Sequence, residues 1–342
     1  MLRRRGGEGV IMAGSVTIEE VARVAGVSRS TVSRVVNGST AVSPEALDAV
    51  RQAIDSLNYV PNRAARSLAS SRTLAVAVIV PEDVHRFFGD PFFASIIAGI
   101  NATISASDYV LTLAIASNDP DDKMIGYVRS GAVDGAIIVS HHEGDTFVDR
   151  IAASVPVVFG GRPTSLTTET YFVDVDNVRG ARDAVEYLLG QGHRSIATIT
   201  GPHTMVASND RLDGYRQALA AAGVTPGMIA DGDFTIQGGA AAMRSILAQS
   251  TPDAVFVASD LMARGALGVL ESAGLRVPDD VAVVGYDDSL LATSAAPMLT
   301  TMRQPSFDQG KRMAQVLLER LEGHEPPHAT VMPTELIVRD SA

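Results

Sequence analysis

TIEEVARVAGVSRSTVSRVVN, residues 17–37, is the stretch that decides the fold of the N-terminal part of the chain. Thr17 is a good helix N-cap, and Glu20, three residues later, can complete a capping box. Gly26 allows the left-handed turn that ends a first helix, and Ser28 can cap a second one. Apolar residues recur at helical spacing in both halves, whereas the outer face of the second helix stays polar. The spacing therefore predicts a helix-turn-helix.

The second helix of this pair carries residue types that read DNA. In a helix-turn-helix the second helix enters the major groove, and its early residues reach base edges. Arg29 and Arg34 can pair bidentately with guanine, while hydroxyl groups can serve bases or phosphate. The alternative is an ordinary helical hairpin with solvated arginines. The DNA-binding residues predicted on this motif are Thr17, Ser28, Arg29, Ser30, Thr31, Ser33, Arg34 and Asn37.

Two further segments extend the motif. Residues 44–57, PEALDAVRQAIDSL, predict a third amphipathic helix that begins at Pro44, a favoured first-turn residue. The next run, NYVPNRAARSLASSRT, contains residues 62–69, which are too few for a stable isolated helix. Their small side chains and single leucine suit a segment that orders only against DNA.

Taken together, the run from Thr17 to Thr73 resembles the head and hinge of the LacI/GalR family of transcriptional repressors. The resemblance implies a homodimer on a palindromic operator, with Leu68 wedged into the minor groove at the operator centre. Such wedging kinks DNA at a cost of about a few kcal/mol for each unstacked step. The alternative for Leu68 is packing against the rest of the protein. The further positions that the resemblance assigns to DNA contact are Tyr59, Asn62, Ala65 and Ala69.

Charge and composition fit this interpretation. Residues 1–72 hold ten Arg and six acidic residues, a net charge of +4, so the remainder of the chain carries −15. A cationic head on an anionic body is expected when only the head contacts a polyanion. The absence of cysteine excludes disulfides, thiolate metal sites and a cysteine nucleophile.

The sequence also predicts where the protein works. No stretch approaches the roughly 20 apolar residues that a membrane span needs. The first 16 residues form an N-terminal extension without the apolar run of a secretory signal peptide, and Met12 is an alternative start. We therefore expect a cytoplasmic protein with no membrane contact.

From Leu74 the pattern changes to short apolar runs that alternate with helical stretches. Examples of the runs are LAVAVIV (74–80), GAIIVS (135–140), IATITG (196–201) and AVFVAS (254–259). This alternation predicts βα units on parallel sheets, and the rhythm restarts after Asp174. The expected fold is thus an all-α helix-turn-helix head plus hinge helix, followed by an α/β body of two doubly wound lobes. The body resembles the periplasmic-binding-protein fold that these repressors use.

The expected domain boundaries follow from these patterns and from the resemblance. They are a helix-turn-helix domain over 17–61, a hinge and linker over 62–73, and an effector-binding and dimerisation domain over 74–342. Within the body we expect lobe one over about 74–174 plus 305–330, and lobe two over about 175–302 plus 331–342.

Residues that follow the expected strands define a candidate ligand site. In open α/β sheets, ligands bind outside the carboxyl ends of the strands. The mixture found there, aromatic rings with forked polar groups, suits the apolar faces and vicinal hydroxyls of a sugar. Alternatives are a phenylalanine core and a helix-capping role for Asp260. The predicted effector-binding residues are Phe92, Phe93, His141, Gly161, Arg162, Arg211, Phe234, Asp260, Asp287 and Gln304, of which the resemblance supports the phenylalanines, Arg211, Asp260, Asp287 and Gln304.

The runs FGGRP, YFVDVDN, ITGPHTMVASNDRLDGYR and GDF resemble an actinobacterial subgroup of the family that responds to cellobiose or related β-glucosides. Purine-responsive members carry a bulky aromatic near Gly160 and Gly161, so a purine is disfavoured. Maltose-like and other oligosaccharides remain open, as does the reverse sense, in which the ligand promotes DNA binding. The expectation is a repressor of carbohydrate-utilisation genes that a sugar effector, expected to be a disaccharide, releases from its operator.

Other classes of protein fit the sequence less well. It contains no G-x-x-x-x-G-K-[ST], G-x-S-x-G or H-E-x-x-H motif, so we expect no enzyme, no cofactor and no metal site. A sugar transport receptor with the same body fold is a remote alternative, because it needs an export signal and has no use for residues 17–72.

Overall fold

The computed structural model describes most of the chain, namely residues 16–36, 41–59, 72–117 and 122–342. Two compact units result, one ending at Thr73 and the other beginning at Leu74. No helix in the described ranges is long and apolar enough to cross a membrane. Several predictions lie outside the described residues: the alternative start at Met12 and the DNA contacts of Asn37, Asn62, Ala65, Leu68 and Ala69.

The first unit contains the predicted helices, α1 (Ile18–Ala25), α2 (Arg29–Val36) and α3 (Pro44–Leu57). Thr17 and Glu20 form the predicted capping box, and Gly26 has a φ of 68°, the left-handed conformation that ends α1. The hydroxyl oxygen of Ser28 accepts a hydrogen bond from the Thr31 amide at 3.1 Å, which caps α2. The helix-turn-helix prediction is therefore confirmed.

A small apolar core holds the three helices together. Its buried members are Val21, Ala22, Val32, Val50, Ala53 and Tyr59. The prediction that Tyr59 contacts DNA needs correction, because the residue is only 9% exposed and its ring packs among these side chains. Tyr59 is primarily a packing residue of the head.

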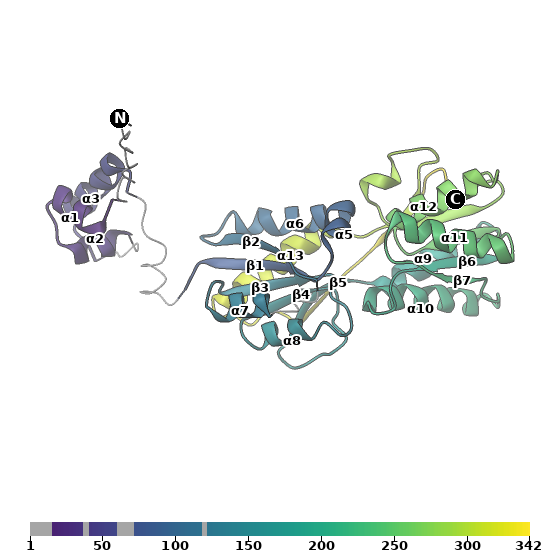
Figure 1. Ribbon diagram of the computed structural model, residues 1–342, viewed down its shortest axis with the longest axis horizontal. Helices are drawn as coiled ribbons and strands as arrows, with labels where there is room; N and C mark the ends of the chain where they lie inside the picture. Colours follow the sequence, from purple (N-terminus) through teal and green to yellow (C-terminus); the bar gives the residue numbers. More distant parts are fainter. Residues whose placement is uncertain (1–15, 37–40, 60–71, 118–121) are drawn as a thin grey trace, which may run out of the picture. The chain divides into compact units, whose positions relative to one another are not determined.

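The second unit begins with an α/β lobe built on a parallel sheet, which has six strands within the described residues, in the order β11-β5-β4-β3-β1-β2. β1 is apolar throughout because it is buried on both faces of the sheet. Helices α6 and α13 pack on one face and α7 and α8 on the other (Figure 1). The strands are β1 (Ala75–Val80), β2 (Val110–Ile115), β3 (Gly135–Val139), β4 (Val157–Gly160), β5 (Tyr171–Val175) and β11 (Ala329–Met332). The helices are α5 (Val84–Gly89), α6 (Pro91–Ile104), α7 (Lys123–Arg129), α8 (Thr146–Ala152) and α13 (Ser306–Leu321).

The second lobe repeats this design. Its described strands run in the order β12-β10-β9-β8-β6-β7, and β12 is antiparallel to β10. Helices α9 and α10 cover one face, and α11 and α12 cover the other (Figure 1). The strands are β6 (Ile196–Thr200), β7 (Ile229–Asp231), β8 (Ala254–Val257), β9 (Ala282–Asp287), β10 (Thr300–Arg303) and β12 (Glu335–Ile337). The helices are α9 (Asn177–Gly190), α10 (Val206–Ala221), α11 (Ile236–Gln249), α12 (Asp260–Ser272) and the 3₁₀ turn η1 (Leu290–Ala292).

The chain passes between the lobes three times: after β5, between β10 and α13, and between β11 and β12. The last of these passages follows Met332, so the expected boundary at residue 330 falls inside β11. Because the strands of each sheet are parallel apart from β12, the loops at their carboxyl ends collect at one edge of the lobe. These loops build the site described next.

Candidate ligand-binding pocket and DNA-reading helix

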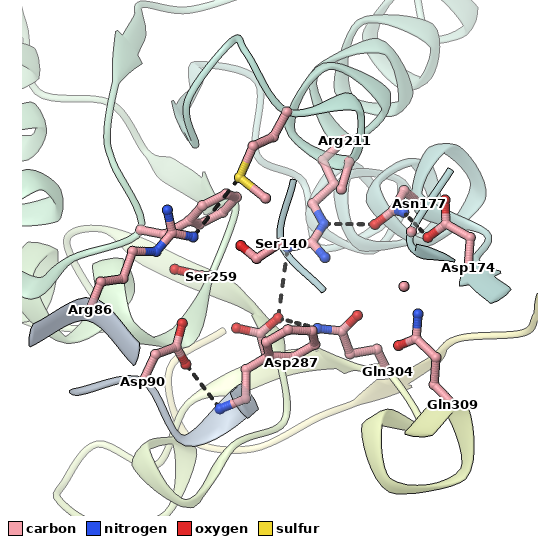
Figure 2. A pocket seen from close by; sticks show the side chains of 16 residues that line it. Arg86, Asp90, Ser140, Asp174, Asn177, Arg211, Ser259, Asp287, Gln304 and Gln309 are labelled. Atoms are coloured by element: carbon pink, nitrogen blue, oxygen red, sulfur yellow. Dashed lines mark hydrogen bonds and ion pairs between the residues drawn. The ribbon is translucent and has the colours of Figure 1, made fainter. Parts of the chain in front are cut away.

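A pocket lies between the two lobes of the body and encloses about 600 Å³, part of which is open to solvent. Small-molecule sites typically occupy about 300–1,000 Å³. Figure 2 shows polar side chains from both lobes pointing into it. The lining residues are Arg86, Asp90, Phe92, Ser140, Gly160, Gly161, Asp174, Asn177, Met205, Ala207, Arg211, Phe234, Ser259, Asp287, Gln304 and Gln309.

Arg211, on the second turn of α10, is fixed from several directions although it is only 5% exposed. Its Nε donates to Asn177 Oδ1 at 2.9 Å, and its Nη1 donates to the Ala258 carbonyl at 2.6 Å. The guanidinium lies 3.7 Å from the centre of the Tyr286 ring. Its Nη1 is also 3.7 Å from an Asp287 carboxylate oxygen. The arginine is thus pre-oriented, which lowers the entropic cost of binding a hydroxylated ligand.

Asp287 enters the pocket at the end of β9, where its φ of 117° departs from strand geometry. Gln304 donates from Nε2 to Asp287 Oδ1 at 2.7 Å. Burial raises the pKa of Asp287 well above its usual range, and the positive charge of Arg211 opposes this rise. Burial thus favours the neutral form of this carboxyl group, and Arg211 favours the charged form.

The first lobe contributes a second charged cluster. Arg86 Nη1 lies 2.9 Å from Glu82 Oε1, and the same oxygen accepts from the Ser140 hydroxyl at 2.6 Å. Asp90 Oδ1 accepts from the Phe92 amide at 3.0 Å, and burial raises the pKa of Asp90. A donor and an acceptor are therefore held together on this side of the pocket (Figure 2).

Two aromatic rings supply apolar surface. Phe92 is the second residue of α6, and Phe234 follows β7 with a left-handed φ of 60°. Gly201 makes room for the second ring, because a Cβ there would lie 2.1 Å from Phe234 Cζ. Aromatic faces next to fixed polar groups are the combination that a sugar ring requires.

Six of the ten predicted effector residues line this pocket, namely Phe92, Gly161, Arg211, Phe234, Asp287 and Gln304. The other four predictions need correction. Phe93 is 1% exposed and packs in the core of the first lobe. His141 packs edge-on against Phe159 and lines a neighbouring cavity, where burial lowers the pKa of His141 to about 4.

The remaining two corrections concern charged residues beside the pocket. Arg162 turns to Asp210, with its Nη2 2.8 and 2.7 Å from the two carboxylate oxygens. Asp260 is fully buried behind the pocket wall, where it accepts from the Thr301 hydroxyl at 2.6 Å and the Ser289 amide at 2.7 Å. Ser259, rather than Asp260, caps α12.

Several residues line the pocket that the sequence patterns did not predict. Asp174 lies near the end of β5 and Asn177 begins α9, both in the run DVDN, so the strand-end rule could have found them. Asn177 Nδ2 donates to Asp174 Oδ1 at 3.1 Å, which links this pair to Arg211. Arg86 and Asp90 lie on and after the short helix α5, where the sequence indicates only a loop and therefore no side-chain direction. Gln309 lies within the helical run of α13 and carried no signal.

In the head, α2 exposes the residues predicted to read DNA. Arg29, Ser30 and Arg34 are exposed, and Arg29 Nε lies 3.1 Å from Glu19 Oε1. An ion pair between such exposed side chains contributes about 0–1 kcal/mol, so it leaves Arg29 free to exchange partners. Nothing in the described head blocks this face of α2 from a partner.

Comparison with known proteins adds independent observations. Residues 17–62 match the model of the bacterial regulatory proteins of the lacI family, and residues 185–342 match a periplasmic binding protein-like domain. The chain is 46% identical over 332 residues to the HTH-type transcriptional regulator CelR of Thermobifida fusca, covering 95% of this chain and 98% of the relative. The chain belongs to the lacI family.

Other members of the lacI family agree over nearly the full length. The HTH-type transcriptional repressor CytR of Escherichia coli is 34% identical, with 96% of each chain covered. A solved CelR–cellobiose complex has a TM-score of 0.76 at 44% identity, covering 96% of this chain and all of that one. The lac repressor dimer bound to operator and the anti-inducer ONPF has a TM-score of 0.85 at 29% identity, covering 96% and 99%. These relatives are regulators rather than enzymes, and no group of three or more potential metal ligands occurs in the described ranges.

Proposed function

We propose that this lacI-family member is a homodimeric repressor of carbohydrate-utilisation genes that cellobiose or a related β-glucoside releases from a palindromic operator. The observation that carries the proposal is the pocket between the lobes, which Arg211, Asp287 and Gln304 line together with the aromatic residues Phe92 and Phe234. Similarity to the CelR–cellobiose complex supports this choice of sugar. No step of this function requires catalysis, and a target in genomic DNA implies a cytoplasmic protein.

The head supplies sequence recognition. Each α2 reads one half-site through Arg29, Ser30 and Arg34, with neighbouring hydroxyls holding phosphate. Similarity to an operator-bound lac repressor dimer supports two heads on one palindrome. The hinge predictions, with Leu68 in the minor groove, belong to the same proposal. Because arginines neutralise phosphates, operator affinity should fall steeply as salt rises.

The body regulates how tightly the protein binds its operator. A ligand shifts a conformational equilibrium only by its difference in affinity between the two states. The pocket takes side chains from both lobes, so a sugar that contacts both favours the closed arrangement of the lobes. Closure then separates the two hinges of the dimer and lowers operator affinity.

The test is a binding titration of labelled palindromic and random duplexes at moderate salt, with and without cellobiose. We expect a clear preference for one palindrome, which cellobiose lowers. Arg29→Ala should weaken specific binding by roughly 10- to 100-fold, the range for one bidentate base contact. Arg51→Ala, an exposed arginine on α3, is the matched control.

Three outcomes would contradict parts of the proposal. No preference for any palindrome in every ligand state would overturn the DNA-binding function. Cellobiose that strengthens operator binding would reverse the sense of regulation. A thermal shift with a purine and none with any sugar would replace the effector class.

A further inference from the structure

We propose that Gln309 makes the pocket selective for effectors that carry a hydroxyl group at both ends, so that cellobiose binds better than glucosides with an apolar aglycone. This inference rests on the proposed function, because it assumes that the pocket binds a β-glucoside. It concerns which members of that class act.

The orientation of the Gln309 amide is fixed by its partner. The residue is 4% exposed, and its Nε2 lies 3.0 Å from the carbonyl oxygen of Val173. A carbonyl can only accept, so the amide nitrogen must face it and the amide oxygen must point elsewhere. Gln309 lines the pocket, and Figure 2 shows its amide on the pocket wall. The amide oxygen therefore faces away from Val173, where it can accept a hydrogen bond from a ligand.

That acceptor has no partner in the protein. Gln309 Oε1 is buried and makes no hydrogen bond within the described residues. A buried polar atom without a partner costs free energy, so it favours any ligand that brings it a donor. The neighbouring Asp174 already accepts three hydrogen bonds, from the amides of Arg162 and Val175 and from Asn177 Nδ2, whereas Gln309 Oε1 accepts none within the described residues. A ligand hydroxyl is the group that this end of the pocket lacks.

The other end of the pocket is polar as well. In Figure 2, Arg86 and Asp90 lie on the side opposite Gln309, with Arg211 and Asp287 between them. Arg86 Nε is also buried without a hydrogen-bond partner among the described residues. A hydroxyl group both donates and accepts, so a ligand with sugar rings at both ends satisfies both sides. In a phenyl glucoside the glucose ring would satisfy one side, but the phenyl group would leave the other side's polar groups unpaired, which strongly disfavours binding.

The experiment is calorimetric titration of the full-length protein with cellobiose and with phenyl β-glucoside. The wild-type protein should bind cellobiose at least about tenfold more tightly, the cost of one unpaired buried group. Gln309→Leu should lose roughly 10- to 100-fold in cellobiose affinity and keep or gain affinity for phenyl β-glucoside. Asp308→Asn, an exposed neighbour on the same helix, should change neither affinity.

The ratio of the two affinities separates recognition from folding. If Gln309 only stabilises the fold through Val173, the leucine variant weakens both ligands equally and the ratio stays constant, which overturns the inference. Equal wild-type affinities for the two ligands also overturn it, and this comparison decides the question if the variant does not fold. In both cases cellobiose still binds, so the proposed function stands. A wild-type protein that binds neither glucoside overturns both.

Discussion

Arg211 shows how a single residue can report on ligand binding without affecting DNA binding. It bonds Asn177 and the Ala258 carbonyl and lies over Tyr286, all within the body. The head is a separate compact unit that ends at Thr73. A change at Arg211 therefore acts on the pocket and leaves the α2 surface intact.

Arg211→Ala should lower cellobiose affinity by roughly 10- to 100-fold, because one charged hydrogen-bonding group is lost. It should keep operator binding and lose its release by cellobiose. Arg216→Ala is the matched control, since this arginine lies on the same helix with its side chain 53% exposed. A fluorescence-anisotropy titration of operator with and without cellobiose measures both effects. Retained induction in Arg211→Ala would contradict the assigned role.

The buried carboxyl group of Asp260 makes the stability of the second lobe depend on pH. Burial raises the pKa of Asp260 to about 7 from an ordinary value of 3.8. Between these values Asp260 binds more protons in the folded protein than in the unfolded chain, so its contribution to the free energy of unfolding falls as pH rises from about 4 to 7. Burial raises the pKa of Asp287 as well, which gives a slope of the same sign.

Asp260→Asn should remove this contribution, which is about 1–3 kcal/mol between pH 5 and pH 7.5, and leave those of Asp287 and of His141, whose lowered pKa gives a slope of opposite sign. The amide can still accept from Ser289 and donate to the Thr301 hydroxyl oxygen. Urea unfolding at several pH values measures the slope. Asp280→Asn is the control, because the adjacent Arg276 lowers the pKa of the Asp280 carboxyl. An Asp260→Asn variant with the same pH dependence as the wild-type protein would refute this interpretation.

At the residue scale, the sequence predicted which types of residue line the pocket better than it predicted the direction in which each side chain points. The strand-end rule pointed to Asp287 and the family resemblance to Gln304, and both residues line the pocket. It could not separate Phe92 from Phe93, because adjacent residues on a helix point about 100° apart and only packing shows which of them enters the core. Gln309 was missed because a polar residue inside an amphipathic helix ordinarily faces solvent.

At the scale of elements, helix pairs in the body meet through glycines. A Cβ on Gly99 of α6 would lie 1.9 Å from the Phe307 carbonyl oxygen of α13, and one on Gly310 of α13 would lie 2.2 Å from that of Ile96. In lobe two, a Cβ on Gly265 of α12 would meet the Ile236 carbonyl of α11 at 2.0 Å. Backbones this close leave no space for a side chain, so these glycines set the distance between the helices.

Gly99→Ala should therefore destabilise the body by about 1–3 kcal/mol, because the two helices must separate to admit the methyl group. Gly268→Ala in α12 is the control, since this glycine is exposed and a Cβ added to it would meet no atom within 4 Å. It should stabilise by about 0.5–1 kcal/mol through helix propensity. Urea unfolding of both variants distinguishes them by sign. If Gly99→Ala left the free energy of unfolding unchanged, α6 and α13 would be able to move apart at little cost.

Periodicity predicted the long helices of the body and the alternation of strands with helices. It missed α5, which spans Val84–Gly89 and is too short to show a period. It gave no range for β7 or β11, which have three and four residues and derive their stability from neighbouring strands. Short elements of this kind depend on tertiary contacts that local sequence does not contain.

At the scale of the whole body, several contacts join the lobes beside the pocket, among them those of Arg162, His142 and Glu143. Arg162 binds Asp210 through both carboxylate oxygens. The Glu143 amide donates to the Thr204 carbonyl at 2.7 Å, and His142 Nδ1 lies 2.7 Å from the Thr204 hydroxyl. Each contact has one partner in lobe one and one in lobe two, so each forms only when the lobes are close.

The Arg162–Asp210 pair should therefore stabilise the sugar-bound, closed arrangement. The side chains are 41% and 17% exposed, so solvent screening limits the contribution to about 0.5–1 kcal/mol. Arg162→Gln and Asp210→Asn should each weaken cellobiose binding by about two- to fivefold, and the double variant should be no weaker than either single one. Raising salt should reduce cellobiose affinity more in the wild type than in these variants.

Arg276→Gln with Asp280→Asn provides the control cycle, since that ion pair lies within lobe two alone. Calorimetry on the four proteins of each cycle measures the coupling, and strictly additive losses for Arg162 and Asp210 would show that the pair does not hold the lobes together.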